Sequence, residues 1–200
     1  MNGTSRTRSR KPAMPGIEWG EDYEKNFFLK SNLVGGLLQP YRKYMQARGF
    51  TPEEAEQVRK LLDAHSGTSH QQAIADKQIV DELEANTRLG QAIEAKIDFE
   101  EAVYKEWIEH TKKQDDAWEK SVFDGQKTIY RKGDRKDGVE AWTTNEDGAD
   151  MGGGGIGWDH KSTVESMFKE GYRLLGGAAL AIGSPGEDEI TFVKYKKKHK

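Results

Sequence analysis

The stretch from residue 70 to residue 120 constrains the fold of this 200-residue chain most, because it contains no proline and a single glycine, Gly90. Apolar side chains recur through it at the helical spacing of three and four residues. They stand at Ile79, Leu83, Ile93, Ile97, Tyr104, Trp107 and Ile108, and Thr111 continues the stripe. The pattern predicts one long helix, or two consecutive helices broken near Asn86 and Gly90. Such a stripe is expected to pack within the chain or against another chain.

The chain before this stretch divides into a polar arm and further helical sequence. Residues 1–20 are rich in Ser, Thr, Arg, Pro and Gly, and we expect a flexible basic arm. The run Thr-Pro-Glu-Glu at residues 51–54 predicts a helix start with a capping box, and this helix is expected to reach about Ala64. We therefore expect a helical domain over residues 21–122.

The composition changes near residue 123, where glycine becomes frequent and short β-like runs appear. These runs cover residues 128–131, 139–144, 178–182 and 190–195. A helix with one apolar face is expected between Ser162 and Leu175. The sequence therefore predicts an α+β fold, in which a small mixed domain over residues 123–200 follows the helical domain.

The balance of residue types excludes several classes of protein. Hydrophobic residues make up 34% and charged residues 32%, and no run of about 18 apolar residues occurs, so no membrane span is expected. The absence of cysteine excludes disulfides and thiolate metal sites and is compatible with a reducing, cytoplasmic compartment. A net charge of -3 does not indicate a nucleic-acid-binding domain, although the basic termini could make weak phosphate contacts.

Carboxylates gather where an expected turn, residues 183–186, enters the last β-like run. In a strand, Glu187 and Glu189 would share one face and Asp188 would point to the other. Two carboxylates on one face can hold an acid, a base or an electrostatic stabiliser over a substrate. The alternative is a charged turn that is simply solvated.

A metal site is a competing interpretation of the C-terminal part of the chain. Oxygen and imidazole ligands are available at Asp147, Asp150, Asp159 and His160. Their spacing matches no metal-binding loop that we recognise, and we expect no metal.

Three motifs of the C-terminal part occur in an informative order. They are Tyr130-Arg131-Lys132-Gly133, Ala141-Trp142-Thr143-Thr144 and Glu187-Asp188-Glu189, and Ala149 lies six residues after Thr143. Over about residues 127–195 this set resembles the Arg–Ser–Glu class of mono-ADP-ribosyltransferases, which includes bacterial toxins and phage enzymes. That class has a serine where this chain has Ala141, and a glycine directly after the arginine where this chain has Lys132.

The resemblance implies a role for each motif. NAD, the ADP-ribose donor, would be bound by Arg131, Thr143, Thr144 and Trp142. Trp142 and Trp158 could stack on nicotinamide or adenine, and the alternative is that Trp142 lies in the core and Trp158 covers the glycine-rich loop. Glu189 would be the catalytic glutamate that stabilises positive charge on the ribose. Glu187 would face the acceptor, as in members that modify arginine side chains. Arg131, Thr143 and Glu189 are then expected to converge in one cleft. Positions of Arg131 and Glu189 on opposite faces of the sheet would count against the enzyme.

The same resemblance implies a fold, a partner and a location. The C-terminal domain would be a small mixed sheet of ADP-ribosyltransferase type, and the acceptor would be a side chain of a target protein. The location would be the host cytoplasm, or a virion if the chain is of phage origin. The alternative is a non-enzymatic structural or assembly protein, such as a virion component, that contacts its partner through its long helices.

Overall fold

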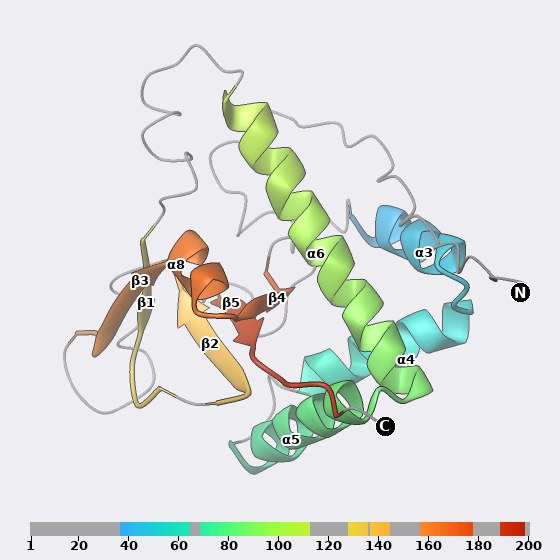
Figure 1. Ribbon diagram of the computed structural model, residues 1–200, viewed down its shortest axis with the longest axis horizontal. Coiled ribbons are helices and arrows are strands. Elements are labelled where there is room, and N and C mark those ends of the chain that lie inside the picture. The colour runs from blue at the N-terminus through green and yellow to red at the C-terminus, as the bar shows by residue number, and fades with distance from the viewer. Residues whose placement is uncertain are drawn as a thin grey trace, which may run out of the picture.

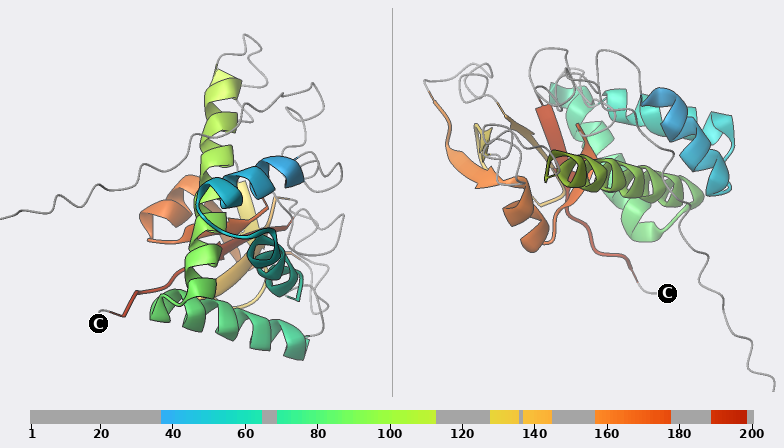
Figure 2. Two further views of the ribbon diagram at one scale, coloured as in Figure 1. Left: turned by 90° about the vertical axis from the view of Figure 1, so that its right-hand side faces the viewer. Right: turned by 90° about the horizontal axis from the view of Figure 1, so that it is seen from above.

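The computed structural model describes residues 37–64, 69–112, 128–135, 137–144, 157–177 and 189–198. The helices that precede the long helix α6 (Arg88–Lys112) gather on one side of the molecule, and a five-stranded sheet with one short helix lies on the other, with α6 running between them (Figure 1). The views turned by 90° show the same division (Figure 2). The predicted arm at residues 1–20 lies outside the described residues.

Two short helices, α3 (Leu38–Ala47) and α4 (Pro52–Asp63), precede the long ones. The predicted capping box of α4 is confirmed. The backbone nitrogen of Glu54 donates to Thr51 Oγ1 at 3.1 Å, and the backbone nitrogen of Thr51 donates to Glu54 Oε2 at 2.9 Å. These two bonds satisfy donors that the first helical turn leaves without partners, so the local sequence sets this helix start.

The long helical stretch forms two helices, α5 (Ser69–Ala85) and α6. They are separated at Asn86, whose φ of 51° ends the first helix. Gly90 lies inside α6, where a Cβ atom would come within 1.9 Å of the Glu82 carbonyl oxygen on α5. The glycine therefore permits close packing of the two helices, and the break near Asn86 is confirmed.

The apolar stripe packs within the chain. Its described side chains are at most 9% exposed: Ile79, Leu83, Ile93, Ile97, Tyr104 and Ile108. On another part of α6, the ring of Phe99 contacts the rings of Tyr41 and Tyr44 from α3, with centroids 5.7 and 5.5 Å apart. The side chains of Trp107 and Thr111 lie outside the described residues. Helix α6 is thus the axis of the helical part.

The sheet has the strand order β3-β1-β2-β5-β4, and each neighbouring pair is antiparallel. The strands are β1 (Thr128–Arg131), β2 (Val139–Thr143), β3 (His160–Thr163), β4 (Arg173–Gly176) and β5 (Glu189–Val193). The predicted runs at 128–131, 139–144 and 190–195 therefore overlap β1, β2 and β5, whereas 178–182 lies outside the described residues. An α+β fold is confirmed.

The helix predicted between Ser162 and Leu175 is wrong at both ends. Only α8 (Val164–Lys169) is helical, and Thr163 caps it by accepting a hydrogen bond from the backbone nitrogen of Ser166. Gly171, with a φ of 91°, then redirects the chain into β4. The residues before and after α8 form β3 and β4. Strand β3 gains ladder hydrogen bonds from β1, and β4 gains them from β5. This pairing between distant segments outweighs the local helical pattern.

The helical part and the sheet share one core. A single cluster of buried hydrophobic residues includes side chains from α3, α4, α5, α6, α8 and all the strands except β3. Lys96 of α6 donates to the carbonyl oxygen of Leu175 in β4, and its ammonium group pairs with Glu100 at 2.8 Å in a fully buried position. The predicted boundary at residue 123 lies outside the described residues.

Candidate functional site

One row of side chains crosses four strands of the sheet. Lys161 pairs with Tyr130, Tyr130 with Thr143, and Thr143 with Glu189. Residues directly opposite each other in antiparallel strands project from the same face. We call these four residues the Glu189 row. It brings together two of the predicted site residues, Thr143 and Glu189, from segments 46 positions apart in the sequence.

A hydroxyl group holds the Glu189 carboxylate. Thr191 Oγ1 donates to Glu189 Oε1 at 3.3 Å, and Thr191 is fully buried. Thr191 pairs across the strands with Ala141, the position at which the transferase class has its serine. On the other side of Glu189, Thr143 is only 8% exposed. A hydroxyl of β5, two residues after Glu189, therefore contacts the carboxylate from the strand that carries it.

The other end of the Glu189 row is aromatic and cationic. Trp158, just before β3, is 37% exposed, and its ring centroid lies 5.7 Å from that of Tyr130. The Lys161 ammonium lies 5.9 Å from the same tryptophan ring. An exposed indole beside a cation can stack on a planar ring and attract an anion.

Arg131 does not join this row. It follows Tyr130 in β1 and therefore projects from the opposite face of the sheet. Its Nη1 donates to the Ala141 carbonyl at 2.7 Å, and its Nε and Nη2 donate to the Asp134 carbonyl at 3.0 and 2.8 Å. The side chain is 8% exposed, and burial lowers the pKa of the guanidinium. The prediction that Arg131 and Glu189 converge in one cleft is wrong for this reason.

The other predicted site residues lie apart from Glu189 or outside the described residues. Trp142 shares the face of Arg131, is 2% exposed, and donates from Nε1 to Glu140 Oε2 at 2.9 Å. Its indole therefore belongs to the core. Thr144 follows the end of β2 and is partly buried. Glu187, like the expected turn before it, lies outside the described residues.

Glu140 is a buried carboxylate that sequence reasoning missed. It is fully buried, and Arg135 Nε donates to its two oxygens at 3.1 and 3.0 Å. Tyr172 also donates to it, at 3.0 Å, and burial together with this bond raises the pKa of the tyrosine. The sequence contained a signal for this burial. Glu140 and Trp142 lie two positions apart in a strand, so alternation places the carboxylate on the same face as a large apolar side chain. These contacts attach the segment after α8 to the sheet.

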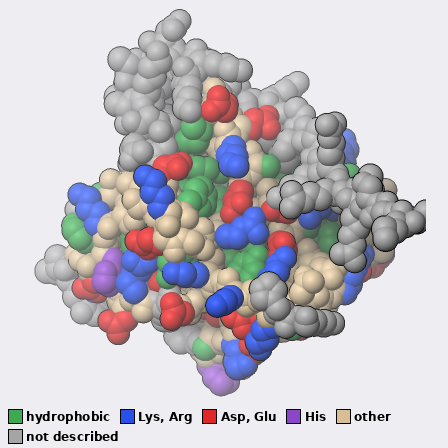
Figure 3. Space-filling view, viewed as in Figure 1, with side chains coloured by type: hydrophobic (Ala, Val, Ile, Leu, Met, Phe, Trp, Pro, Cys, Tyr) green, Lys and Arg blue, Asp and Glu red, His purple; other side chains and the backbone are tan. Residues whose placement is uncertain are grey.

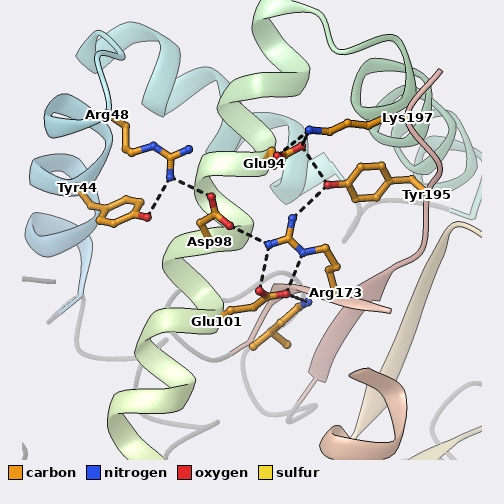
Figure 4. Close-up of polar contacts among 9 residues, drawn as sticks. Tyr44, Arg48, Glu94, Asp98, Glu101, Arg173, Tyr195 and Lys197 are labelled. Atoms are coloured by element: carbon orange, nitrogen blue, oxygen red, sulfur yellow. Dashed lines mark hydrogen bonds and ion pairs between the residues drawn. The ribbon is translucent and has the colours of Figure 1, made fainter. Parts of the chain in front are cut away.

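Charged side chains also fix the sheet to α6 (Figure 4). At the start of β4, Arg173 Nη2 lies 2.8 Å from Asp98 Oδ1 and 3.0 Å from Glu101 Oε2. Arg48 follows the last residue of α3, and its Nη1 bonds the second oxygen of Asp98 at 2.9 Å. Asp98 is thus shared by a helix and a strand. The network holds β4, the neighbour of the strand that carries Glu189, against the long helix.

The segment after β5 is held in the same way. Tyr195 donates to Glu94 Oε2 at 3.2 Å, and Lys197 Nζ lies 2.8 Å from that oxygen (Figure 4). The backbone nitrogen of Lys198 donates to the Glu84 carbonyl at 2.9 Å. Basic and acidic side chains are interspersed over the face in Figure 3. The basic C-terminus therefore lies against acidic helix positions, which weakens the expectation of nucleic-acid contact.

The competing metal site gains no support from the described residues. Among them, no group of three or more His, Asp or Glu side chains is arranged to hold a metal ion. Asp159 Oδ2 instead accepts from the backbone nitrogen of Gly133 at 2.7 Å. Asp147 and Asp150 lie outside the described residues.

Comparisons with known proteins identify no relative. No protein-family model, curated protein or solved structure matches the chain. Within the described part of the chain, no helix is long and apolar enough to cross a membrane. The functional inference therefore rests on the geometry of the Glu189 row.

Proposed function

We propose that the chain is a mono-ADP-ribosyltransferase whose reaction centres on Glu189. The observation that carries the proposal is the direct pairing of Thr143 with Glu189 on neighbouring strands. This pairing supports the roles that the motif order implies for these two residues. The hydroxyl of Thr191 on the Glu189 carboxylate supports it further, because a held carboxylate costs little to reorganise when charge develops beside it.

The reaction proposed is a displacement at the ribose carbon of NAD that bears nicotinamide. The bond from that carbon to nicotinamide breaks, and its electron pair leaves with nicotinamide. A nucleophilic atom of the acceptor forms the new bond and loses its proton. Positive charge develops on the ribose during the exchange, and the Glu189 carboxylate is placed to stabilise it. We assign proton removal from the acceptor to Glu187, as the resemblance implies, with an arginine side chain as the candidate acceptor.

The residues fit the ribose end of NAD better than the diphosphate end. Arg131, an expected NAD ligand that could hold the diphosphate, donates to backbone carbonyls on the other face of the sheet. We therefore assign it a structural role, in which it ties the segment after β1 to the backbone of β2. Thr191 is a positioning residue in this proposal, since it acts through Glu189.

Transfer of labelled ADP-ribose from NAD to lysate proteins tests the proposal. Glu189→Gln is expected to reduce transfer by about 100- to 1,000-fold, the usual loss when an electrostatic stabiliser of a transition state is removed. Glu106→Gln is the matched control, because Glu106 is also a partly buried carboxylate but lies on α6. Absence of labelled protein, or labelling that Glu189→Gln leaves unchanged, would overturn the proposal.

A second candidate is a non-enzymatic binding or assembly protein. The position of Arg131 favours it, since the guanidinium that the transferase class uses for NAD is occupied by Asp134 and Ala141. The apolar stripe of α5 and α6 is buried inside the molecule, so a partner would contact other surfaces. A folded wild-type protein that neither labels an acceptor nor consumes NAD is the result that this candidate predicts.

A further inference from the structure

The Glu189 row has two chemically different ends. The carboxylate of Glu189 stands on β5, and Lys161 stands on β3, three strand positions away in the sheet. Neighbouring strands lie about 4.8 Å apart, so the two backbone positions are separated by about 14 Å. Tyr130 lies between them and contacts Trp158. A ligand that lies along the row therefore meets a carboxylate first and an aromatic, cationic patch later.

We propose that Trp158 and Lys161 form a nucleotide subsite that binds the adenine base and an adjacent phosphate. Trp158 is one of two exposed large hydrophobic side chains among the described residues, and Ile74 on α5 is the other. A tryptophan supported by Tyr130 presents a ring on which a base can stack. Lys161, also exposed, supplies a positive charge that suits a phosphate.

This inference rests on the proposed function and names the second half of its substrate site. If the nicotinamide ribose lies at Glu189, the diphosphate and the adenosine must extend across the face that Glu189 shares with Thr143 and Tyr130. Arg131 projects from the opposite face, where it bonds backbone carbonyls. The strand register places Lys161 of β3 on the face of Glu189. Arg173 of β4 shares this face, because it pairs with Val193, but its guanidinium is bonded to Asp98 and Glu101. Lys161 therefore takes the role that sequence reasoning assigned to Arg131.

Binding of AMP and adenosine to the full-length protein, measured by calorimetry, tests the subsite without requiring activity. Trp158→Ala is expected to weaken both ligands by about tenfold, since stacking on an aromatic side chain contributes at this level. Lys161→Gln is expected to weaken AMP by about tenfold, the scale of one charged hydrogen bond, and to leave adenosine unchanged. Ile74→Ala and Lys169→Gln are matched controls, because both parent side chains are exposed and lie outside the row.

The outcomes separate this inference from the proposed function. AMP binding that fails to occur, or that Trp158→Ala leaves unchanged, overturns the subsite whether or not the protein transfers ADP-ribose. Binding that depends on Trp158 and Lys161 in a protein without transferase activity supports the subsite and overturns the proposed function. A single-stranded oligonucleotide that binds through the same two residues more tightly than ADP-ribose would overturn the assignment to a dinucleotide.

Discussion

The two faces of the sheet each carry a glutamate, and the two glutamates have different surroundings. Glu140 on β2 is fully buried against the guanidinium of Arg135, the indole of Trp142 and the hydroxyl of Tyr172. Glu189 on β5, the neighbouring strand, is partly exposed and accepts a hydrogen bond from Thr191. One carboxylate is bonded to a cation inside the core, and the other is partly exposed and accepts a hydrogen bond from a buried hydroxyl.

The difference indicates which glutamate can serve a reaction. A carboxylate in a buried ion pair has its charge balanced by its partner, and it contributes mainly to the arrangement of the elements that meet there. A carboxylate fixed by hydroxyl groups keeps its negative charge available to a substrate. Three predictions, in decreasing order of expected effect, test whether this division between the faces is correct.

The largest effect is expected from Glu140→Gln. This substitution removes the negative charge that pairs with Arg135. We expect the free energy of unfolding to fall by about 3 kcal/mol, which is the low end of the range for breaking a buried ion pair. The low end applies because Arg135 is partly exposed. Glu189→Gln is the matched control and is expected to change it by less than about 1 kcal/mol. Urea denaturation measures both. Equal stability losses for the two variants would remove the distinction between the faces.

The next effect concerns Arg131. Arg131→Lys keeps the charge but loses the planar fork that reaches the carbonyls of Asp134 and Ala141. We expect the free energy of unfolding to fall by about 2 kcal/mol, because a buried carbonyl loses its donor. In an active enzyme the KM for NAD should stay unchanged. A variant of normal stability with a raised KM would place Arg131 at the diphosphate and contradict the face assignment.

The smallest effect is expected from Thr191→Val, which removes the hydroxyl from Glu189. Transfer activity should fall by about tenfold in kcat, the kinetic equivalent of one hydrogen bond to a charged group, with little change in KM. Adding Ala141→Ser should restore much of the loss, because position 141 pairs directly with position 191. If the double variant transfers as slowly as Thr191→Val alone, a hydroxyl at position 141 does not replace the one at position 191, and the proposed action of Thr191 through Glu189 is contradicted.

The helical part could be predicted from the sequence because its determinants are local. The capping box at Thr51 and Glu54 and the three-four spacing of apolar residues lie within a few positions of one another. The long stripe likewise predicted one long helix or two helices broken near Asn86, and the structure has the second arrangement. The function of Gly90 was not predictable, because it depends on the approach of α5 to α6.

The sheet could be predicted only in part. The β-like runs predicted at 128–131, 139–144 and 190–195 overlap β1, β2 and β5. The motif order indicated that residues near Thr143 and Glu189 lie together, and these two residues pair in the sheet. Strands β3 and β4 were missed, because the segment around α8 has a helical pattern and its strands depend on partners far away in the sequence.

The sequence by itself determined which residue types enter the strands, and alternation determined that Arg131 and Tyr130 must point to opposite faces. Only the tertiary structure decided which of the two faces Glu189 occupies. That choice depends on the register between β1, β2 and β5, where a shift of one residue would exchange the faces. The register, rather than the motif, separates Arg131 from Glu189 and places Thr143 directly beside the glutamate.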